Sequence, residues 1–342
     1  MKLTLALVCL LKIPVINAVS KLIFMKSQRV GLLMSLDTML GVYRTNKKTS
    51  LYHSNGGAIK NKHMKKNSFL RGVLPLLFMG VLFTGCFKKF DPDSYKPKFS
   101  AGGFTSSRDI KPANLVGYWA FNGSMIDSVT GTAAVPTGVG YANGFKGQAM
   151  KGADKGYAIF TPSARIRNLQ SFTITYWMNS PVNTSGIVGL VNLANTSEFW
   201  GNINSFIENG STAASGRFRV NLRSGTNDVW LARDGIVDFF DKWVSIGISY
   251  NAANKTATLY LNGSVLVRTV ATNFAGPINF LNVGNLVFGA VHFQTTPSQT
   301  SATGSQGWAS FLTGLLDEVR FYDAALTDEE MDALVKLEGK GK

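Results

Sequence analysis

Residues 242–270 read KWVSIGISYNAANKTATLYLNGSVLVRTV, and this stretch decides the fold class. Its first part, up to Tyr250, alternates apolar residues with small or polar ones, which is the pattern of a β-strand with one buried face. Farther on, Asn262-Gly263 separates two β-rich runs. An Asn-Gly pair in that position is a strong hairpin signal, because both central residues of a type I′ turn need positive φ. The stretch therefore predicts a strand followed by a β-hairpin.

Similar patterns extend over the chain from Leu115 onward. Residues 171–178 alternate apolar residues with threonines, and no helical stretch separates the apolar runs as a doubly wound fold would require. The pattern predicts an antiparallel β-sandwich. One helix is expected at the end of the chain, where Thr327 and Glu330 can form a capping box. Shorter strands are expected at residues 116–121, 157–160, 187–193, 217–222 and 286–291.

Four segments, in order along the chain, resemble one family. They are GYWAFNG at 117–123, followed by DSVTG at 127–131; SFTITYW at 171–177; TLYLNG at 258–263; and GLLDEVRFY at 314–322. They are similar to the opening strand, first long core strand, central hairpin and closing strand of laminin-G-like domains of the concanavalin A-like lectin/glucanase class. The resemblance covers residues 114–338 and implies an all-β, two-sheet antiparallel jelly-roll sandwich with a short C-terminal helix. It also implies a secreted or surface protein that binds glycans or other extracellular ligands.

The formal net charge of +15 is concentrated before the predicted domain. Residues 1–85 contain 13 of the 35 basic residues and one acidic residue, whereas residues 86–342 contain 22 basic and 19 acidic residues. A nucleic-acid-binding domain needs clustered basic residues on its own surface, so no nucleic-acid partner is predicted. The two cysteines and three scattered histidines provide neither a disulfide scaffold nor the ligand set of a zinc site.

Residues 64–86 read MKKNSFLRGVLPLLFMGVLFTGC and have the composition of a secretion signal. A basic start is followed by an apolar run that is too short to span a bilayer comfortably. The ending Phe83-Thr84-Gly85-Cys86 resembles the lipobox of bacterial lipoproteins, although Phe83 stands where leucine is usual. The resemblance implies lipidation of Cys86 and a membrane partner through a lipid anchor. The alternative is an ordinary secretory signal, or an interfacial helix with an incidental cysteine.

The chain is thus expected to have four parts. Residues 1–63 are interpreted as an over-extended start or an unstructured basic leader, and residues 64–85 as a lipoprotein signal peptide. Residues 86–113 contain three prolines and alternating charges without an apolar period, which is typical of a tether. Residues 114–338 form the laminin-G-like jelly roll. The expected location is the outer membrane, lipid-anchored and exposed at the surface.

Two acids are candidates for a structural calcium site. In the run 315–322, strict alternation places Asp317 on the same face as Val319 and Phe321, where a carboxylate is costly unless it is hydrogen-bonded, paired or bound to metal. In laminin-G-like domains the matching acid and the acid after the opening strand, here Asp127, often lie near a structural Ca²⁺, and backbone carbonyls would complete its oxygen shell. The alternatives are an Asp317 bonded to loop amides without an ion, and an Asp127 that only stabilises a turn.

Aromatic residues in polar, glycine-rich segments are the candidates for carbohydrate binding. Aromatic faces stack on the C–H-rich faces of sugar rings, while amides and carboxylates bind the hydroxyls. Trp200 and Asn202 lie in such a segment, and Trp230 and Trp308 are further candidates. Trp308 follows the polar stretch 294–307, whose length is typical of a functional loop. For each of these tryptophans, core packing is the alternative. The tryptophans expected in the core are Trp119, Trp177 and Trp243.

The leading functional hypothesis is a non-catalytic, glycan-binding surface lipoprotein that takes part in polysaccharide capture. One alternative is a structural or adhesive module that binds a protein of the outer membrane. The other is a jelly-roll glycoside hydrolase or lyase, which the sequence disfavours. Glu198 and Glu208 are isolated, without the closely spaced carboxylates of the jelly-roll glucanases, and His292 is the only histidine after Cys86 for a lyase that uses His with Tyr.

Overall fold

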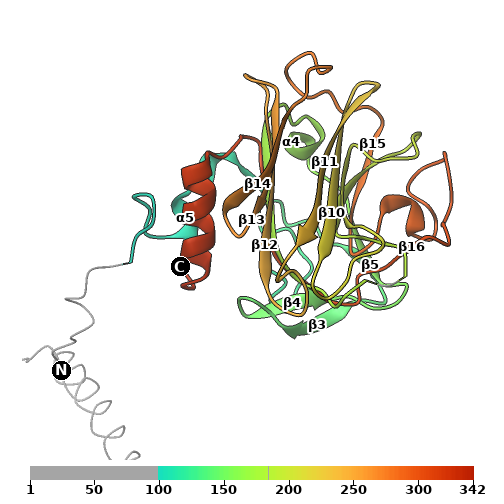
Figure 1. Ribbon diagram of the computed structural model, residues 1–342, viewed down its shortest axis with the longest axis horizontal. Helices are drawn as coiled ribbons and strands as arrows, with labels where there is room; N and C mark the ends of the chain where they lie inside the picture. The colour runs from blue at the N-terminus through green and yellow to red at the C-terminus, as the bar shows by residue number, and fades with distance from the viewer. Residues whose placement is uncertain (1–98, 184) are drawn as a thin grey trace, which may run out of the picture. The chain divides into compact units, whose positions relative to one another are not determined.

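Two β-sheets pack face to face in the computed structural model of the chain, which describes residues 99–183 and 185–342 (Figure 1). The first sheet has eight strands in the order β14-β13-β12-β6-β17-β4-β3, and β1 pairs with β17. Its strands are β1 (Leu115–Trp119), β3 (Gly140–Asn143), β4 (Gln148–Lys151), β6 (Phe172–Asn179), β12 (Val244–Asn251), β13 (Thr256–Leu261), β14 (Ser264–Val270) and β17 (Leu315–Tyr322).

The second sheet has nine strands in the order β11-β10-β9-β8-β15-β5-β2, and β7 pairs with β9 and, in parallel, with β16. The fold is therefore the all-β sandwich expected from the sequence. The strands of this sheet are β2 (Val135–Thr137), β5 (Tyr157–Phe160), β7 (Ile187–Gly189), β8 (Val191–Asn195), β9 (Ile203–Ile207), β10 (Gly216–Ser224), β11 (Asn227–Ile236), β15 (Val283–Phe288) and β16 (Ala309–Ser310).

Among residues 99–183 and 185–342, the short helices are η3 (Ser107–Asp109), η4 (Pro112–Asn114), α4 (Ala164–Arg167) and η5 (His292–Gln294), and the longest helix is α5 (Asp328–Glu338). In the part of the chain that the structure describes, no helix combines the length and apolarity needed to cross a membrane. The predicted leader 1–63, the signal peptide 64–85 and the lipidation site Cys86 lie outside the described residues.

The predicted hairpin is confirmed. Strands β12, β13 and β14 pair antiparallel in sequence order, and Asn262 and Gly263 have the φ values of 50° and 82° that the turn requires. The alternation of β6 and β12 is also confirmed, because all of their predicted apolar residues are buried in one core cluster between the sheets. These residues are Phe172, Ile174, Tyr176 and Met178 in β6, and Val244, Ile246, Ile248 and Tyr250 in β12.

Of the three tryptophans expected in the core, Trp119 and Trp177 are buried, and Trp119 alone lies in the core cluster between the sheets. Its ring packs edge-on against Phe160 and Phe288, each at 5.2 Å between ring centroids. Trp177 is buried on the outer face of β6, where it stacks on Phe145 at 3.6 Å, and Trp243 is half-buried just before β12. Alternation explains why Trp177 lies on the outer face, because it follows the core residue Tyr176 and must point the other way.

Strand β17 departs from the alternation expected for residues 315–322. The pairing of β17 with β6 shifts between Asp317 and Arg320, and Glu318 has a φ of 51°, so a β-bulge interrupts the period. As a result Leu316, Val319 and Phe321 enter the core, whereas Asp317 pairs with Trp177 on the opposite face of the sheet. The expectation that Asp317 shares a face with Val319 and Phe321 was wrong.

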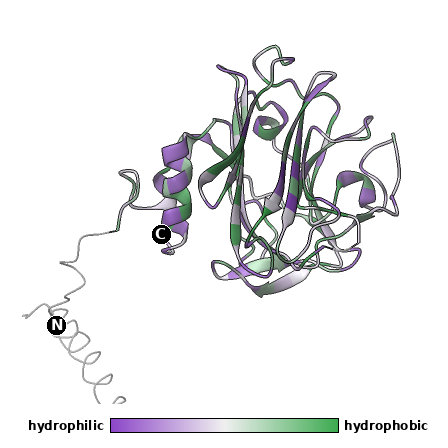
Figure 2. Ribbon diagram, viewed as in Figure 1, coloured by the Kyte–Doolittle hydropathy of each residue, from purple (hydrophilic) through white to green (hydrophobic). Residues whose placement is uncertain are grey.

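Helix α5 begins as the sequence predicted. The Thr327 side chain accepts from the Glu330 amide, and the Glu330 carboxylate accepts from the Thr327 amide at 2.8 Å. The helix carries hydrophilic and hydrophobic residues (Figure 2), and Met331, Leu334 and Leu337 form a separate buried cluster with Tyr260 and Tyr322 on the outer face of the first sheet. Leu326, just before the helix, belongs to the same cluster and can form a hydrophobic staple with Met331.

A buried ion cluster joins α5 to the first sheet. Arg320 of β17 pairs with Glu318 at 2.6 Å and with Glu338 at the end of α5, and the Trp177 indole donates to Glu338 at 2.6 Å. The guanidinium of Arg320 also lies 4.5 Å from the centroid of the Tyr118 ring. Three charged side chains are thus held out of water between the helix and the sheet, where loss of one partner leaves an uncompensated charge.

Replacement of Glu338 by Ala is expected to lower the free energy of unfolding by about 3 kcal/mol, because Arg320 would keep a buried charge with one counter-charge fewer. The measurement is denaturant unfolding followed by tryptophan fluorescence. Asp332→Ala, on the same helix but in the exposed pair with Lys336, is the control and should change stability by about 0.5 kcal/mol or less. Equal losses in the two variants would contradict the role given to the cluster.

Candidate functional site

The three tryptophans singled out in the sequence converge on one groove. Trp200, Trp230 and Trp308 line a hollow of about 390 Å³ on the outer face of the nine-stranded sheet. They come from three separate segments, which are the turn before β9, the middle of β11 and the loop before β16. The other residues that line this aromatic groove are Ile187, Phe206, Glu208, Arg219 and Ala232.

Alternation along β11 places Trp230 in the groove. Its neighbours Val229 and Leu231 are buried in the core, so the side chain between them lies on the outer face of the sheet. Trp200 meets it edge-on at 5.4 Å between ring centroids and stacks on Phe206 of β9 at 5.5 Å, with 6° between the ring planes. The half-buried Trp200 is therefore held by two aromatic neighbours.

Trp308 is held at its place by backbone pairing and by the loop that precedes it. Its carbonyl accepts from the Ile187 amide at 3.0 Å, next to the parallel pairing of β16 with β7. Within the loop, the Gln294 side chain donates to the carbonyl of Ala309 at 3.0 Å and accepts from the Gln306 amide at 2.9 Å. The loop before Trp308 is therefore fastened across its base.

Two of the three indoles offer surface to a ligand. Trp230 is 38% exposed and Trp308 is 43% exposed, which is unusual for the largest apolar side chain and favours a role in contact with another molecule. A charged pair lies beside them, because Arg219 pairs with Glu208 at 3.5 Å and with Asp234 at 2.7 Å. The groove thus combines aromatic surface with hydrogen-bonding groups.

Asn202, predicted to bind sugar next to Trp200, does not line the groove. It is 1% exposed, and its amide nitrogen donates to the carbonyls of Ala194 and Leu281 at 3.1 and 2.9 Å. Its amide oxygen accepts from the Leu281 amide at 3.3 Å. Because its donors and its acceptor are engaged with the backbone, Asn202 connects β8 with the loop before β15 instead of facing a ligand.

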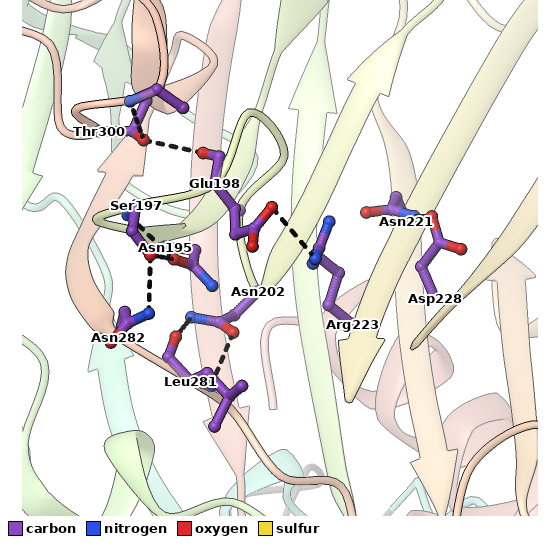
Figure 3. Close-up of polar contacts among 12 residues, drawn as sticks. Asn195, Ser197, Glu198, Asn202, Asn221, Arg223, Asp228, Leu281, Asn282 and Thr300 are labelled. Atoms are coloured by element: carbon purple, nitrogen blue, oxygen red, sulfur yellow. Dashed lines mark hydrogen bonds and ion pairs between the residues drawn. The ribbon is translucent and has the colours of Figure 1, made fainter. Parts of the chain in front are cut away.

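Four polar side chains form a patch beside the groove on the same sheet face. In Figure 3, Glu198 and Arg223 point toward each other, and the closest contact between their charged groups is 3.4 Å. Asn221 lies next to Asp228 and donates to it at 3.1 Å. Asp228 also accepts from the Trp230 indole at 2.9 Å, which connects the polar patch to the aromatic groove.

Asp127 stabilises the turn in which it lies. One carboxylate oxygen accepts from the amides of Tyr118 and Val129 at 2.9 and 3.0 Å, and the other accepts from the Thr130 hydroxyl at 2.6 Å. The side chain is 3% exposed. Both oxygens therefore have protein donors close at hand, which is the arrangement of a turn carboxylate.

Asp317 is surrounded by backbone amides. It accepts from the amides of Lys146 at 3.0 Å and Glu318 at 2.8 Å, and a Cβ on Gly144 would lie 2.6 Å from its carboxylate. Burial raises the pKa of Asp317 to about 7, although the amide of Lys146 acts in the opposite direction. These contacts fit a carboxylate bonded to loop amides, and the donors around it leave little room for a metal ion.

Asp127 and Asp317 therefore do not fit a calcium ion shared between them. Each has its oxygens engaged by its own set of protein donors, whereas Ca²⁺ takes six to eight oxygen ligands. Among residues 99–183 and 185–342, no group of three or more acidic, histidine or cysteine side chains could hold a metal ion.

His292 is buried in η5 and does not reach the groove. Burial lowers its pKa to about 4. The imidazole is thus neutral at physiological pH. A completely covered side chain cannot exchange a proton with a sugar, so His292 does not fit the base of a lyase.

A family comparison agrees with the two-sheet architecture. The sequence profile of the family described as "Concanavalin A-like lectin/glucanases superfamily", laminin-G type, matches residues 151–332. The chain belongs to this superfamily. The match begins after β1–β3 and takes in every residue that lines the aromatic groove. No curated protein sequence matches the chain.

Solved structures with a similar course of the chain include toxin and sialidase domains. The binding domain of botulinum neurotoxin DC with rat synaptotagmin II is 14% identical, with 66% of this chain and 52% of that one covered and a TM-score of 0.48. The binding domain of Paraclostridial mosquitocidal protein 1 is 18% identical, with 65% and 52% covered and a TM-score of 0.46. The Ruminococcus gnavus IT-sialidase CBM40 bound to α2,3-sialyllactose is 18% identical, with 50% of this chain and 85% of that one covered and a TM-score of 0.39. The chain spans about half the length of the two toxin domains.

Within this lectin-like fold, the polar neighbours of the groove were not recognised from the sequence. Arg219, Asn221 and Arg223 alternate with the core residues Val220 and Leu222 along β10, so they form one outward row. The alternation was visible in residues 217–222, but it did not show which tryptophan the row would face. That information comes from the pairing of Asn221 with Trp230 across β10 and β11.

Calcium removal is expected to leave this lectin-like domain unchanged, because the two acids proposed as ligands bind protein donors instead. The thermal unfolding midpoint should be the same, within error, with EDTA and with millimolar CaCl₂. Differential scanning calorimetry provides the measurement, with MgCl₂ as the ionic control. A midpoint that rises with Ca²⁺ but not with Mg²⁺ would restore the calcium site.

Proposed function

We propose that the chain is a non-catalytic glycan-binding surface lipoprotein and that its ligand lies in the aromatic groove. The observation that carries the proposal is the convergence of Trp200, Trp230 and Trp308, from three distant segments, on one hollow in the outer sheet face. Two of these indoles expose more than a third of their surface. In a domain stabilised by a separate core, such exposure is best explained by a ligand.

The chemistry of the groove suits an oligosaccharide. Its volume of about 390 Å³ lies in the range of ligand sites. Indole faces cover the apolar faces of sugar rings, and the nearby Glu208 and Arg219 can accept from and donate to hydroxyls. A protein-binding module would need a contiguous apolar patch, whereas the exposed tryptophans here stand beside charged side chains.

The lining of the groove does not support hydrolysis. Glycoside hydrolases use two carboxyl groups about 5–10 Å apart that flank the scissile bond. Among the described residues that line the groove, Glu208 is the single carboxylate, and it is paired with Arg219. A lyase reaction has no accessible histidine base, because His292 is buried. Binding without turnover is therefore the activity that we propose.

Removal of either exposed indole is expected to weaken glycan binding. Trp230→Ala and Trp308→Ala should each raise the Kd for the best polysaccharide on a glycan array about tenfold, which corresponds to about 1.4 kcal/mol of lost stacking. Isothermal titration calorimetry measures the effect.

Tyr141→Ala is the matched control, because Tyr141 is an exposed aromatic residue on β3 of the other sheet, 39% exposed. It should bind as the unaltered protein does. Wild-type affinity in both tryptophan variants, release of sugar fragments by the purified protein, or binding of a membrane protein without any glycan would each refute the proposal.

The anchor completes the proposal. The apolar run that ends at Cys86 and the first part of the predicted tether would hold the domain away from a bacterial outer membrane, with the groove free to capture polysaccharide for a protein partner in that membrane. The last part of residues 86–113 belongs to the folded domain instead, because η3 lies in it and Ile110 is 1% exposed in the cluster with α5. A single acyl chain binds membranes only marginally, and additional chains make the attachment stable. The sequence around Cys86 supports such an anchor.

Cys86→Ser is expected to abolish incorporation of radiolabelled palmitate and to release the protein from the membrane fraction. Ser94→Ala, eight residues after Cys86, is the control and should leave both unchanged. Fractionation of expressing cells, followed by fluorography, gives both readouts. Labelling that persists in the Cys86 variant would exclude this cysteine as the lipidation site.

A further inference from the structure

On the basis of the proposed function, we infer that the binding site extends from the aromatic groove onto the accessible residues of the polar patch, Glu198, Arg223 and Asp228, and that it selects an uncharged oligosaccharide of more than one ring. Asn221 is completely buried beneath them and bonds to Asp228 and Asn204. The glycan would stack on the indoles at one end and exchange hydrogen bonds with the patch at the other.

The patch and the groove are one continuous surface. Trp230 and Asp228 are two residues apart on β11, hence on the same face, and a hydrogen bond of 2.9 Å joins them. Glu198 lies in the same turn as Trp200 and contacts Arg223 at 3.4 Å. Arg223 and Asp228 are cross-strand partners on β10 and β11, so the patch runs from Trp230 to the segment that carries Trp200. Figure 3 shows Glu198 and Arg223 pointing toward each other, with Asn221 and Asp228 side by side.

Arg223 is the least satisfied charged group of this surface. Its side chain is 14% exposed, and its Nε has no hydrogen-bond partner among the described residues. The ion pair with Glu198 is long, and no hydrogen bond accompanies it in the described part of the chain. A buried donor without a partner costs about 1–3 kcal/mol, so a guanidinium in this position is set to gain from new acceptors.

The balance of charge favours a neutral ligand. The patch has two carboxylates, Glu198 and Asp228, and one guanidinium, while in the groove Glu208 and Arg219 offset each other. A sugar carboxylate would approach Arg223 only by passing close to these acids. A hydroxyl both donates and accepts, so it can bond to Arg223 and to Glu198 at the same time.

The extended site is too long to be filled by a ligand with a single sugar ring. Arg219 borders the groove and Arg223 lies four residues farther along β10, which is roughly 13 Å at the rise of an extended strand. One sugar ring on the indoles does not reach across that span. Affinity should therefore increase with chain length until the glycan reaches the patch.

The test compares matched neutral and acidic glycans on the same variants. Oligogalacturonates of increasing length and their methyl esters have the same backbone and differ in charge, and neutral gluco- and manno-oligosaccharides extend the panel. Wild-type protein should bind neutral oligosaccharides at least tenfold more tightly than the carboxylated ones, with affinity that rises with length. The affinity for long neutral oligosaccharides should fall about tenfold in Arg223→Lys and in Glu198→Gln. The affinity for short ones should change little.

Arg233→Lys is the matched control, because Arg233 is exposed on β11 outside the patch, and it should behave as wild type. Calorimetric unfolding confirms that each variant is folded. The extension of the site onto the polar patch is overturned, with the proposed function intact, if Trp230→Ala loses binding but either of two results is found. One is tighter binding of carboxylated glycans, and the other is an unchanged dependence of affinity on glycan length in Arg223→Lys and Glu198→Gln. Failure of every glycan to bind, or unchanged binding by the tryptophan variants, overturns the proposed function and the extension together.

Discussion

The burial of alternate side chains between the two sheets is the constraint on which the rest of the molecule depends. Each residue that a strand sends into the core fixes its neighbour on the outer face. On β11, the burial of Val229 and Leu231 forces Trp230 outward, and on β10 the burial of Val220 turns Arg219 and Asn221 out. The composition of the outer sheet face therefore follows directly from how the core is packed.

The sequence predicted those elements whose signals are local. The alternation of β6 and β12, the Asn262-Gly263 turn and the capping box of α5 each depend on neighbouring residues, and all are found. The bulge of β17 was missed because Glu318 adopts positive φ, which a non-glycine residue shows only when its surroundings impose it. Strands β9 and β11 were not predicted, because Asn204 and Ser205 interrupt the apolar run of β9 and charged residues such as Asp228 and Asp234 lie in β11.

The aromatic residues of the candidate site could be predicted from the sequence, but their arrangement in space could not. Trp200, Trp230 and Trp308 stood out through polar, glycine-rich surroundings, while their convergence depends on strand pairing between distant segments. Asn202 shows the limit of reasoning from sequence neighbours, because closeness to Trp200 in sequence does not make the two side chains face the same way. Arg223 could be recognised only once Glu198 and Asp228 were placed around it.

The way in which Trp308 is fastened has a consequence for the energetics of recognition. A two-residue strand, β16, pairs with β7, and Gln294 bonds across the base of the loop, so the rim of the groove is preorganised. A ligand that meets a rim already in its binding shape forfeits little conformational entropy on association. For the binding function that we propose, moderate contacts can then suffice for useful affinity.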